Sequence, residues 1–280
     1  MVQKTVAVYK VQRVQRQDEI GIATKQKTEM ADAHCHLDMI KDSELISRSI
    51  ANGVKTIITN GINFSSSRKA IELSDGRNIF AACGVDPETA SRLSEEALED
   101  EMAKTIELIK KNRKRIVAIG EIGLDYTKAK DQQMKAKQQT VFEAMLEIAK
   151  LLDLPVSVHS RESLAIVMMT LRKKDMMKVH LHFFEGNVAE AKEAERQGYM
   201  ISIPPIESSK RRLIAKDISI NSLMAESDSP AVGESPAWVE KSIRMIAEMK
   251  TMQFEKAAEA LTLNTKRFFN INTAPAVMRM

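Results

Sequence analysis

The chain has 280 residues, of which 44% are hydrophobic and 29% are charged. This composition is typical of a globular protein with a large core, and it excludes disordered and fibrous classes. No apolar run reaches the roughly 18 to 20 residues that cross a bilayer, so we expect no membrane association.

Charge and aromatic content restrict the possible partners. The formal net charge is +4, but residues 1–29 hold six of the 42 Lys and Arg residues and three of the 38 Asp and Glu residues, so the remainder is nearly neutral. Aromatic residues make up only 4% of the chain, too few for a stripe of base-stacking platforms. We therefore expect any nucleic acid to be recognised at a local site, and we infer no obligate protein partner.

Two further features favour a cytoplasmic location. The two cysteines, Cys35 and Cys83, have no CxxC spacing, which suits a reducing compartment. The first residues lack the continuous apolar core of a secretory signal.

Residues 1–29 stand outside the pattern of the rest of the chain. They have only a weak alternation of apolar residues, and Met30 immediately precedes the first predicted strand. Two interpretations remain open: a dispensable extension before a domain at residues 30–280, which we favour, or a basic arm that contacts a partner.

From Met30 onward, short apolar runs rich in Val and Ile alternate with longer stretches of helical period. The predicted strands are Met30–His34, Val54–Gly61, Ile79–Val85, Ile116–Leu124, Pro155–His159, Lys178–Phe184, Gly198–Ile203 and Ser222–Ser227. The amphipathic stretches between them include Ser43–Asn52, Ser94–Asn112, Gln132–Leu152, Ser163–Lys174 and Val188–Gln197.

A strand followed by a helix, eight times over, predicts an α/β protein with a (β/α)8 TIM barrel in a single domain, for which about 250 residues is typical. The best alternative is an open doubly wound sheet. No Gly-rich dinucleotide fingerprint follows the first predicted strand, which favours the barrel.

The chain has five histidines, and all of them lie at or near the ends of the first, fifth and sixth predicted strands. They are His34, His36, His159, His180 and His182. Glu121 and Asp125 close the fourth strand, and Asp228 follows the eighth. Because the carboxyl ends of barrel strands form one face, these side chains should converge there. A carboxylate such as Glu121 after an apolar run is costly unless it is paired or bound to metal, so the cluster favours a metal site.

Spacing alone leaves the individual ligands open. His34 and His36 lie on one face of a strand and can bind one cation together, although an HxH sequence also occurs by chance. His180 and His182 also share a face, so their spacing does not say whether both bind metal. Asp228 is either a ligand or the cap of the next helix.

Five motifs resemble, in order, those of the TatD family of metal-dependent deoxyribonucleases. They are DAHCHLD at 32–38, GEIGLDY at 120–126, VHSR at 158–161, HFFEG at 182–186 and ESDSP at 226–230. The resemblance extends from about residue 31 to the segment 264–269. It implies a metal-dependent hydrolase with a (β/α)8 barrel, in agreement with the alternation of strands and helices.

The resemblance also implies a ligand set for divalent metal ions, with Glu121 shared between two ions. The implied ligands are His34, His36, Glu121, His159, His182 and Asp228. Zn²⁺, Mn²⁺ and Mg²⁺ all suit this mixture of donors. Such ions activate water and stabilise a leaving oxygen, and Asp228 would orient and deprotonate the attacking water. The family pattern does not require His180, for which we expect a supporting role.

The substrate-binding residues are less constrained. Arg161 and Lys128 are candidates to meet a phosphate, although a solvated surface is an equal interpretation for Lys128. Family members usually carry Gly-x-His-Pro where this chain has Asp86 before Pro87. A carboxylate there should repel a substrate phosphate unless it is protonated or neutralised by metal.

The leading functional hypothesis is hydrolysis of phosphodiester bonds in a DNA substrate, by trimming a single strand from an end or by cutting at damaged sites. The alternative enzyme is a hydrolase of small amides or lactones on the same metal site, favoured by the neutral body, the few aromatics and Asp86. A third hypothesis is a binding protein with a structural metal. The absence of a catalytic ligand would support it, but none of the expected ligands is absent from the sequence.

Overall fold

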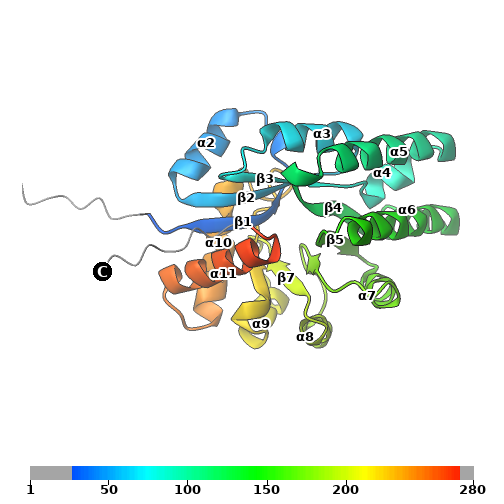
Figure 1. Ribbon diagram of the computed structural model, residues 1–280. Coiled ribbons are helices and arrows are strands. Elements are labelled where there is room, and N and C mark those ends of the chain that lie inside the picture. Colours follow the sequence, from blue (N-terminus) through cyan, green and yellow to red (C-terminus); the bar gives the residue numbers. More distant parts are fainter. Residues whose placement is uncertain (1–26, 272–280) are drawn as a thin grey trace, which may run out of the picture.

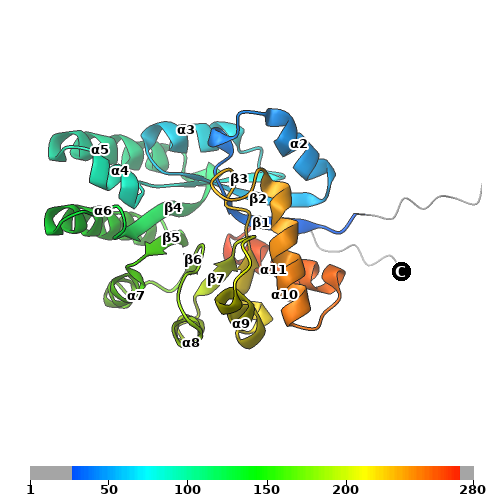
Figure 2. The same cartoon turned by 180° about the vertical axis from the view of Figure 1, so that it is seen from behind.

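The computed structural model describes residues 27–271, so most of the predicted extension at 1–29 lies outside the described residues. Eight parallel strands follow one another in sequence order, β1 to β8, and helices cover their outer side (Figures 1 and 2). This order confirms the predicted (β/α)8 barrel, because an open doubly wound sheet reverses its strand order at one point. Within residues 27–271 no helix is long and apolar enough to cross a membrane.

The strand bounds lie within two residues of the predicted ones, except that the sixth strand ends three residues early, at Leu181. Their bounds are β1 Met30–Cys35, β2 Val54–Gly61, β3 Ile79–Cys83, β4 Ile116–Asp125, β5 Val156–Arg161, β6 Val179–Leu181, β7 Met200–Ile203 and β8 Leu223–Ala225. β6 and β8 are shorter than predicted because the chain leaves the sheet soon after them. Phe183 and Asp228 both have a φ of 46°, a left-handed conformation that an extended strand does not contain.

The helices alternate with the strands as predicted. Their bounds are α2 Ser43–Ala51, α3 Phe64–Leu73, α4 Pro87–Arg92, α5 Glu95–Lys111, α6 Gln132–Leu151, α7 Leu164–Lys173, α8 Val188–Arg196, α9 Ser209–Asp217, α10 Val239–Met249 and α11 Phe254–Phe268. α5 illustrates why they form where they do. The Ser94 side chain accepts a hydrogen bond from the Ala97 amide, acidic residues fill the first turn and lysines the last. The hydrogen bond caps the helix, and the charged residues at both ends stabilise it by interacting favourably with its dipole.

The buried apolar side chains form two layers. The larger layer lies between the strands and the surrounding helices, and its members include Ile57, Leu124 and Val158. The smaller layer fills the barrel interior with Ala33, Ile58, Phe80, Ala82, Ala118, Met224 and Phe269. Because this inner layer is apolar, polar groups inside the barrel gather toward the carboxyl ends of the strands.

Hydrogen bonds between β1 and the segment after β8 close the barrel. The Asp228 amide donates to the His34 carbonyl at 3.0 Å, and the His36 amide donates to the Ser229 carbonyl at 2.7 Å. Below them, the Asp32 carboxylate accepts bonds from the amide and the hydroxyl of Ser227 at 2.8 and 2.6 Å. The first and last strands are therefore held together at the level of the predicted metal ligands.

The close approach of β4 and β5 requires glycine at position 123. Gly123 has a φ of +137°, and a Cβ atom there would lie 2.1 Å from the carbonyl oxygen of His159. We expect Gly123→Ala to lower the free energy of unfolding by about 3 kcal/mol or more, because backbone atoms of two strands must separate. Gly76 also has a positive φ of +67° but nothing within 4 Å, so Gly76→Ala should cost only about 1 to 2 kcal/mol. Urea denaturation followed by circular dichroism measures both values, and equal losses would contradict this account.

Candidate metal centre

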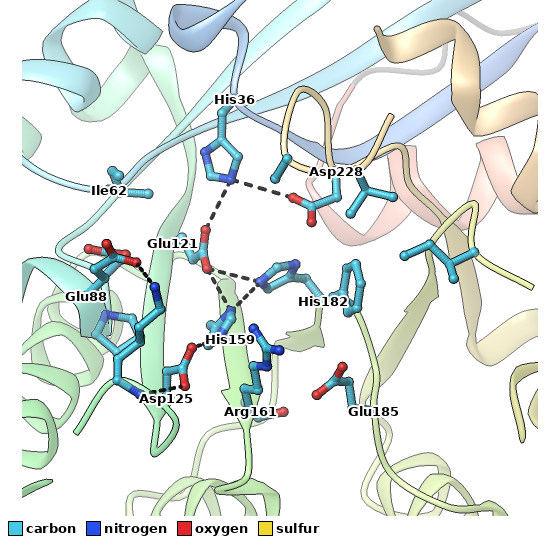
Figure 3. Close-up of a pocket in the computed structure, with 18 of the residues that line it drawn as sticks. His36, Ile62, Glu88, Glu121, Asp125, His159, Arg161, His182, Glu185 and Asp228 are labelled. Carbon is cyan, nitrogen blue, oxygen red and sulfur yellow. Dashed lines mark hydrogen bonds and ion pairs between the residues drawn. The ribbon is translucent and has the colours of Figure 1, made fainter. Parts of the chain in front are cut away.

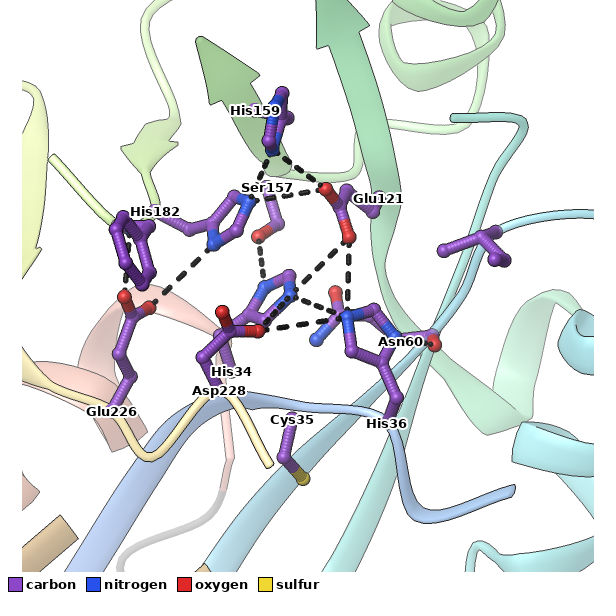
Figure 4. Close-up of polar contacts among 12 residues, drawn as sticks. His34, Cys35, His36, Asn60, Glu121, Ser157, His159, His182, Glu226 and Asp228 are labelled. Atoms are coloured by element: carbon purple, nitrogen blue, oxygen red, sulfur yellow. Dashed lines mark hydrogen bonds and ion pairs between the residues drawn. The ribbon is translucent and has the colours of Figure 1, made fainter. Parts of the chain in front are cut away.

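The carboxylate of Glu121, in β4, lies between two pairs of imidazoles (Figure 4). Its Oε2 atom is 3.4 Å from Nε2 of His34 and 3.3 Å from Nε2 of His36. Its Oε1 atom is 3.0 Å from Nδ1 of His159 and 3.1 Å from Nε2 of His182. Each carboxylate oxygen therefore faces its own pair of ring nitrogens.

Asp228 completes the cluster. Its Oδ1 atom lies 3.8 Å from Nε2 of His36 and 4.0 Å from Nε2 of His34. No hydrogen bond joins its carboxylate to a helix amide within residues 27–271, so the alternative role as a helix cap finds no support there. The six predicted ligands thus lie together, and their donor atoms form three groups, each within 4.8 Å: His34 with His36 and Glu121, Glu121 with His159 and His182, and His34 with His182 and Asp228.

Further contacts orient two of the imidazoles. Nδ1 of His36 is 3.0 Å from the Asn60 carbonyl oxygen, which turns Nε2 toward Glu121. Nε2 of His159 is 3.3 Å from the Asp125 carboxylate, which in turn accepts a hydrogen bond from the Thr127 amide at 2.8 Å. Partners of this kind fix the ring orientation of metal-binding histidines. Asp125 was not among the predicted site residues, although its position at the end of β4 was a signal for it.

His180 lies inside the barrel and connects the cluster to β7 and β8. Its Nδ1 atom is 3.2 Å from Ser157 Oγ, which is 3.4 Å from Nδ1 of His34. Its Nε2 atom is 2.8 Å from Ser202 Oγ, which donates to the Glu226 carboxylate at 2.6 Å. Both ring nitrogens of His180 are already engaged, so the geometry agrees with a supporting role and leaves no nitrogen free for an ion.

The charges of the cluster reinforce one another. Burial alone would raise the pKa of Glu121, but the neighbouring imidazoles, His182 above all, hold it well below its usual range. Burial alone would lower the pKa values of His36 and His159, but hydrogen bonds to carboxylates raise each of them to about 9. A dication that binds to these side chains would replace the protons of His36 and His159.

The donor set therefore fits divalent metal ions. Imidazole nitrogens and carboxylate oxygens are ligands that such ions share, and all of the donors are at least largely buried. Asp228 differs in its protonation, because burial raises its pKa to about 7 against the opposing charges of His182 and His36. It can exchange a proton near neutral pH.

The cluster lies at the base of a cavity of about 530 Å³ at the carboxyl ends of the strands (Figure 3). Both predicted substrate-binding residues line this cavity. Arg161 ends β5 and is exposed, and it makes no ion pair within residues 27–271. Lys128 is also exposed, but its ammonium group lies 3.0 Å from the Glu88 carboxylate.

Asp86 lines the cavity too, but it has a second role that the sequence did not reveal. Its Oδ1 atom accepts a hydrogen bond from the Thr89 amide at 2.8 Å, which caps α4. Burial and the nearby Glu121 raise its pKa to about 6. The expected repulsion of a substrate phosphate is therefore moderated, because this carboxylate is directed at the positive end of a helix.

The two histidines of the predicted sixth strand, His180 and His182, are expected to have different roles. We expect His182→Asn to reduce the bound metal, since His182 faces Glu121, and His180→Asn to leave the metal content nearly unchanged. His180→Asn should instead cost about 1 to 3 kcal/mol of stability, because buried hydroxyl groups lose their partners. Elemental analysis of dialysed protein, together with thermal unfolding, tests both changes. The reverse order of metal loss would mean that the roles are exchanged.

Comparisons with known proteins identify the family of this chain. A family model described as TatD related DNase matches residues 31–270. Human deoxyribonuclease TATDN3 is 29% identical over 262 residues, which cover 86% of this chain and 94% of the relative. An uncharacterized metal-dependent hydrolase of Methanocaldococcus jannaschii is 31% identical over 250 residues, covering 85% of this chain and 96% of the relative. The crystal structure of YjjV, a TatD homologue from Escherichia coli, has a TM-score of 0.78 at 25% identity and covers 88% of this chain and 99% of that one.

Proposed function

The chain belongs to the TatD-related DNase family of metal-dependent hydrolases, and we propose that it hydrolyses phosphodiester bonds in DNA. The observation that carries this proposal is the position of Glu121, whose two oxygens face separate imidazole pairs at the base of an open cavity. Cations on the cavity wall, Arg161 and Lys128, suit an anionic substrate.

We assign the six clustered residues as ligands of two divalent ions that share Glu121. One position would be formed by His34 and His36 with one oxygen of Glu121, and the other by His159 and His182 with its second oxygen. Asp228 lies beside the first pair. When bound, Zn²⁺, Mn²⁺ or Mg²⁺ ions supply Lewis-acid activation of water and of the phosphoryl oxygens.

The side chains of the chain itself position the substrate and move the proton. Asp228 orients the attacking water and accepts its proton on the carboxylate, which lies beside the His34 and His36 imidazoles. Arg161 and Lys128 hold the phosphate, with Lys128 released from Glu88 as it does so.

The depth of the site favours an unpaired strand as substrate. His34 is fully buried and Glu121 is 6% exposed, so a phosphate must enter the cavity to approach them. The width of a duplex keeps its internal phosphates from the base of such a cavity, whereas a single strand is narrow enough to enter. A free end or a damaged site supplies the required flexibility.

The proposal is tested by assaying the purified protein with bis(p-nitrophenyl) phosphate and with single-stranded, duplex and abasic DNA. We expect metal-dependent cleavage of the phosphodiesters, with single-stranded or abasic DNA preferred over intact duplex. Removal of metal with a chelator should abolish the activity, and added Mn²⁺, Zn²⁺ or Mg²⁺ should restore it. Hydrolysis of small amides or lactones without cleavage of any phosphodiester would replace this proposal by the amidohydrolase alternative.

The shared role of Glu121 has its own test. Glu121→Gln should lower phosphodiesterase activity by at least about 100-fold, because an amide cannot supply the charge that links two ions. The variant should fold, since the amide has the same shape, and it should bind less metal than the wild type. Glu44→Gln, on the exposed face of α2, is the control and should retain both properties. Normal activity and metal content in Glu121→Gln would contradict the two-ion assignment.

A further inference from the structure

Arg211 is a buried cation at the wall of the cavity. It lies in the first turn of α9, it is 8% exposed, and it lines the cavity that contains Glu121. Its Nε atom has no hydrogen-bond partner, and no ion pair joins its guanidinium to any residue of the described range 27–271. An unpaired guanidinium is unfavourable in a protein interior. A partner from outside the fold would remove this cost.

An aromatic ring holds Arg211 in place. The guanidinium carbon lies 5.1 Å from the centre of the Phe183 ring, within the range of a cation–π contact. Phe183 is itself fixed, because its amide donates to the Glu226 carboxylate at 2.8 Å and its ring lies edge-on to that of His182, 6.4 Å between centres. One ring thus connects the guanidinium to a metal-site histidine. The cation is positioned before any substrate arrives.

Nearby acids only partly compensate this charge. Glu185 and Glu226 both attract the guanidinium at a distance. The oxygens of Glu226 are engaged by the Phe183 amide and the Ser202 hydroxyl, and Glu185 lines the cavity without forming an ion pair with Arg211. No bonded acceptor within residues 27–271 therefore competes for the guanidinium.

We propose that Arg211 binds a phosphate of the DNA strand other than the one that is cleaved. This inference rests on the proposed function. The planar guanidinium matches the oxygens of a phosphate with two parallel hydrogen bonds. Arg161 ends β5 and Lys128 follows β4, whereas Arg211 follows β7, so the cations reach the cavity from different elements. A substrate with several phosphates contacts more than one of them, and Arg211 makes the enzyme prefer a strand over a single phosphodiester.

The test compares two substrates in the wild type and in Arg211→Gln. One is a single-stranded tetranucleotide with several phosphates, and the other is bis(p-nitrophenyl) phosphate, which has one. We expect the loss in kcat/KM to be at least about tenfold greater for the tetranucleotide than for the reporter, and to lie mainly in KM. The slope of log(1/KM) against log salt should become less steep by about 0.7 for the tetranucleotide, because one phosphate contact is lost.

Two further variants separate recognition from structure. Arg212→Gln removes the neighbouring arginine, which pairs with Glu248 outside the cavity, and should leave the ratio between the substrates unchanged. Arg211→Lys keeps the charge and should retain the salt slope of the wild type, with a smaller rise in KM. An equal loss on both substrates in Arg211→Gln, or an unchanged salt slope, would overturn the inference.

If the protein does not hydrolyse phosphodiesters, the experiment has a different outcome. In that case the wild type cleaves neither substrate, and fluorescence anisotropy with a labelled tetranucleotide decides the role of Arg211. Binding at least about tenfold weaker in Arg211→Gln than in Arg212→Gln would still support phosphate recognition. Equal binding in the two variants would overturn it.

Discussion

The arrangement of the site depends on the burial of one carboxylate, that of Glu121, among four imidazoles. A buried carboxylate is strongly destabilising unless other groups compensate its charge. Here the compensation comes from side chains on three other parts of the barrel, at distances of 3.0 to 3.4 Å. The ends of β1, β4, β5 and β6 must therefore keep their relative positions, since a shift of any one would expose or isolate the charge.

Polar contacts extend this constraint into the barrel interior. His180 links Ser157 to Ser202, and the chain of contacts ends at Glu226, whose carboxylate lies 3.8 Å from Nδ1 of His182. That nitrogen has no hydrogen-bond partner within residues 27–271. The interior thus changes from the apolar layer at one end to a connected polar layer at the other. Such networks specify a single arrangement when nearly all of their members are paired.

The sequence predicted the barrel and the convergence of its histidines because both follow from periodicity. Val and Ile runs at regular intervals identify strands, and strand ends in a barrel share one face. The role of Asp86 could not be predicted in the same way, since a carboxylate before a proline fits a helix cap and a binding site equally well.

Arg211 and Glu226 were missed for a related reason. The sequence Ser-Ser-Lys-Arg-Arg at 208–212, with its cluster of charges, is typical of a solvated helix face, and nothing in it marks Arg211 as buried. Glu226 is the first residue of the ESDSP motif, but the family resemblance implies a role only for Asp228, two residues later. Burial of a charged side chain depends on how a helix is rotated against the sheet, and this rotation is a property of tertiary packing.

The closure of the barrel between β1 and the segment after β8 has a consequence for the order of events during synthesis. His34 is made near the beginning of the domain and Asp228 near its end, and the bond between their backbones spans most of the chain. Contacts of such long sequence separation form late, because a large loop must close first. A nascent chain that has not yet emerged beyond β8 lacks the hydrogen bonds between β1 and the segment after β8, and it also lacks the Asp228 side chain. The cluster of six side chains is then completed only after the segment beyond β8 has been made.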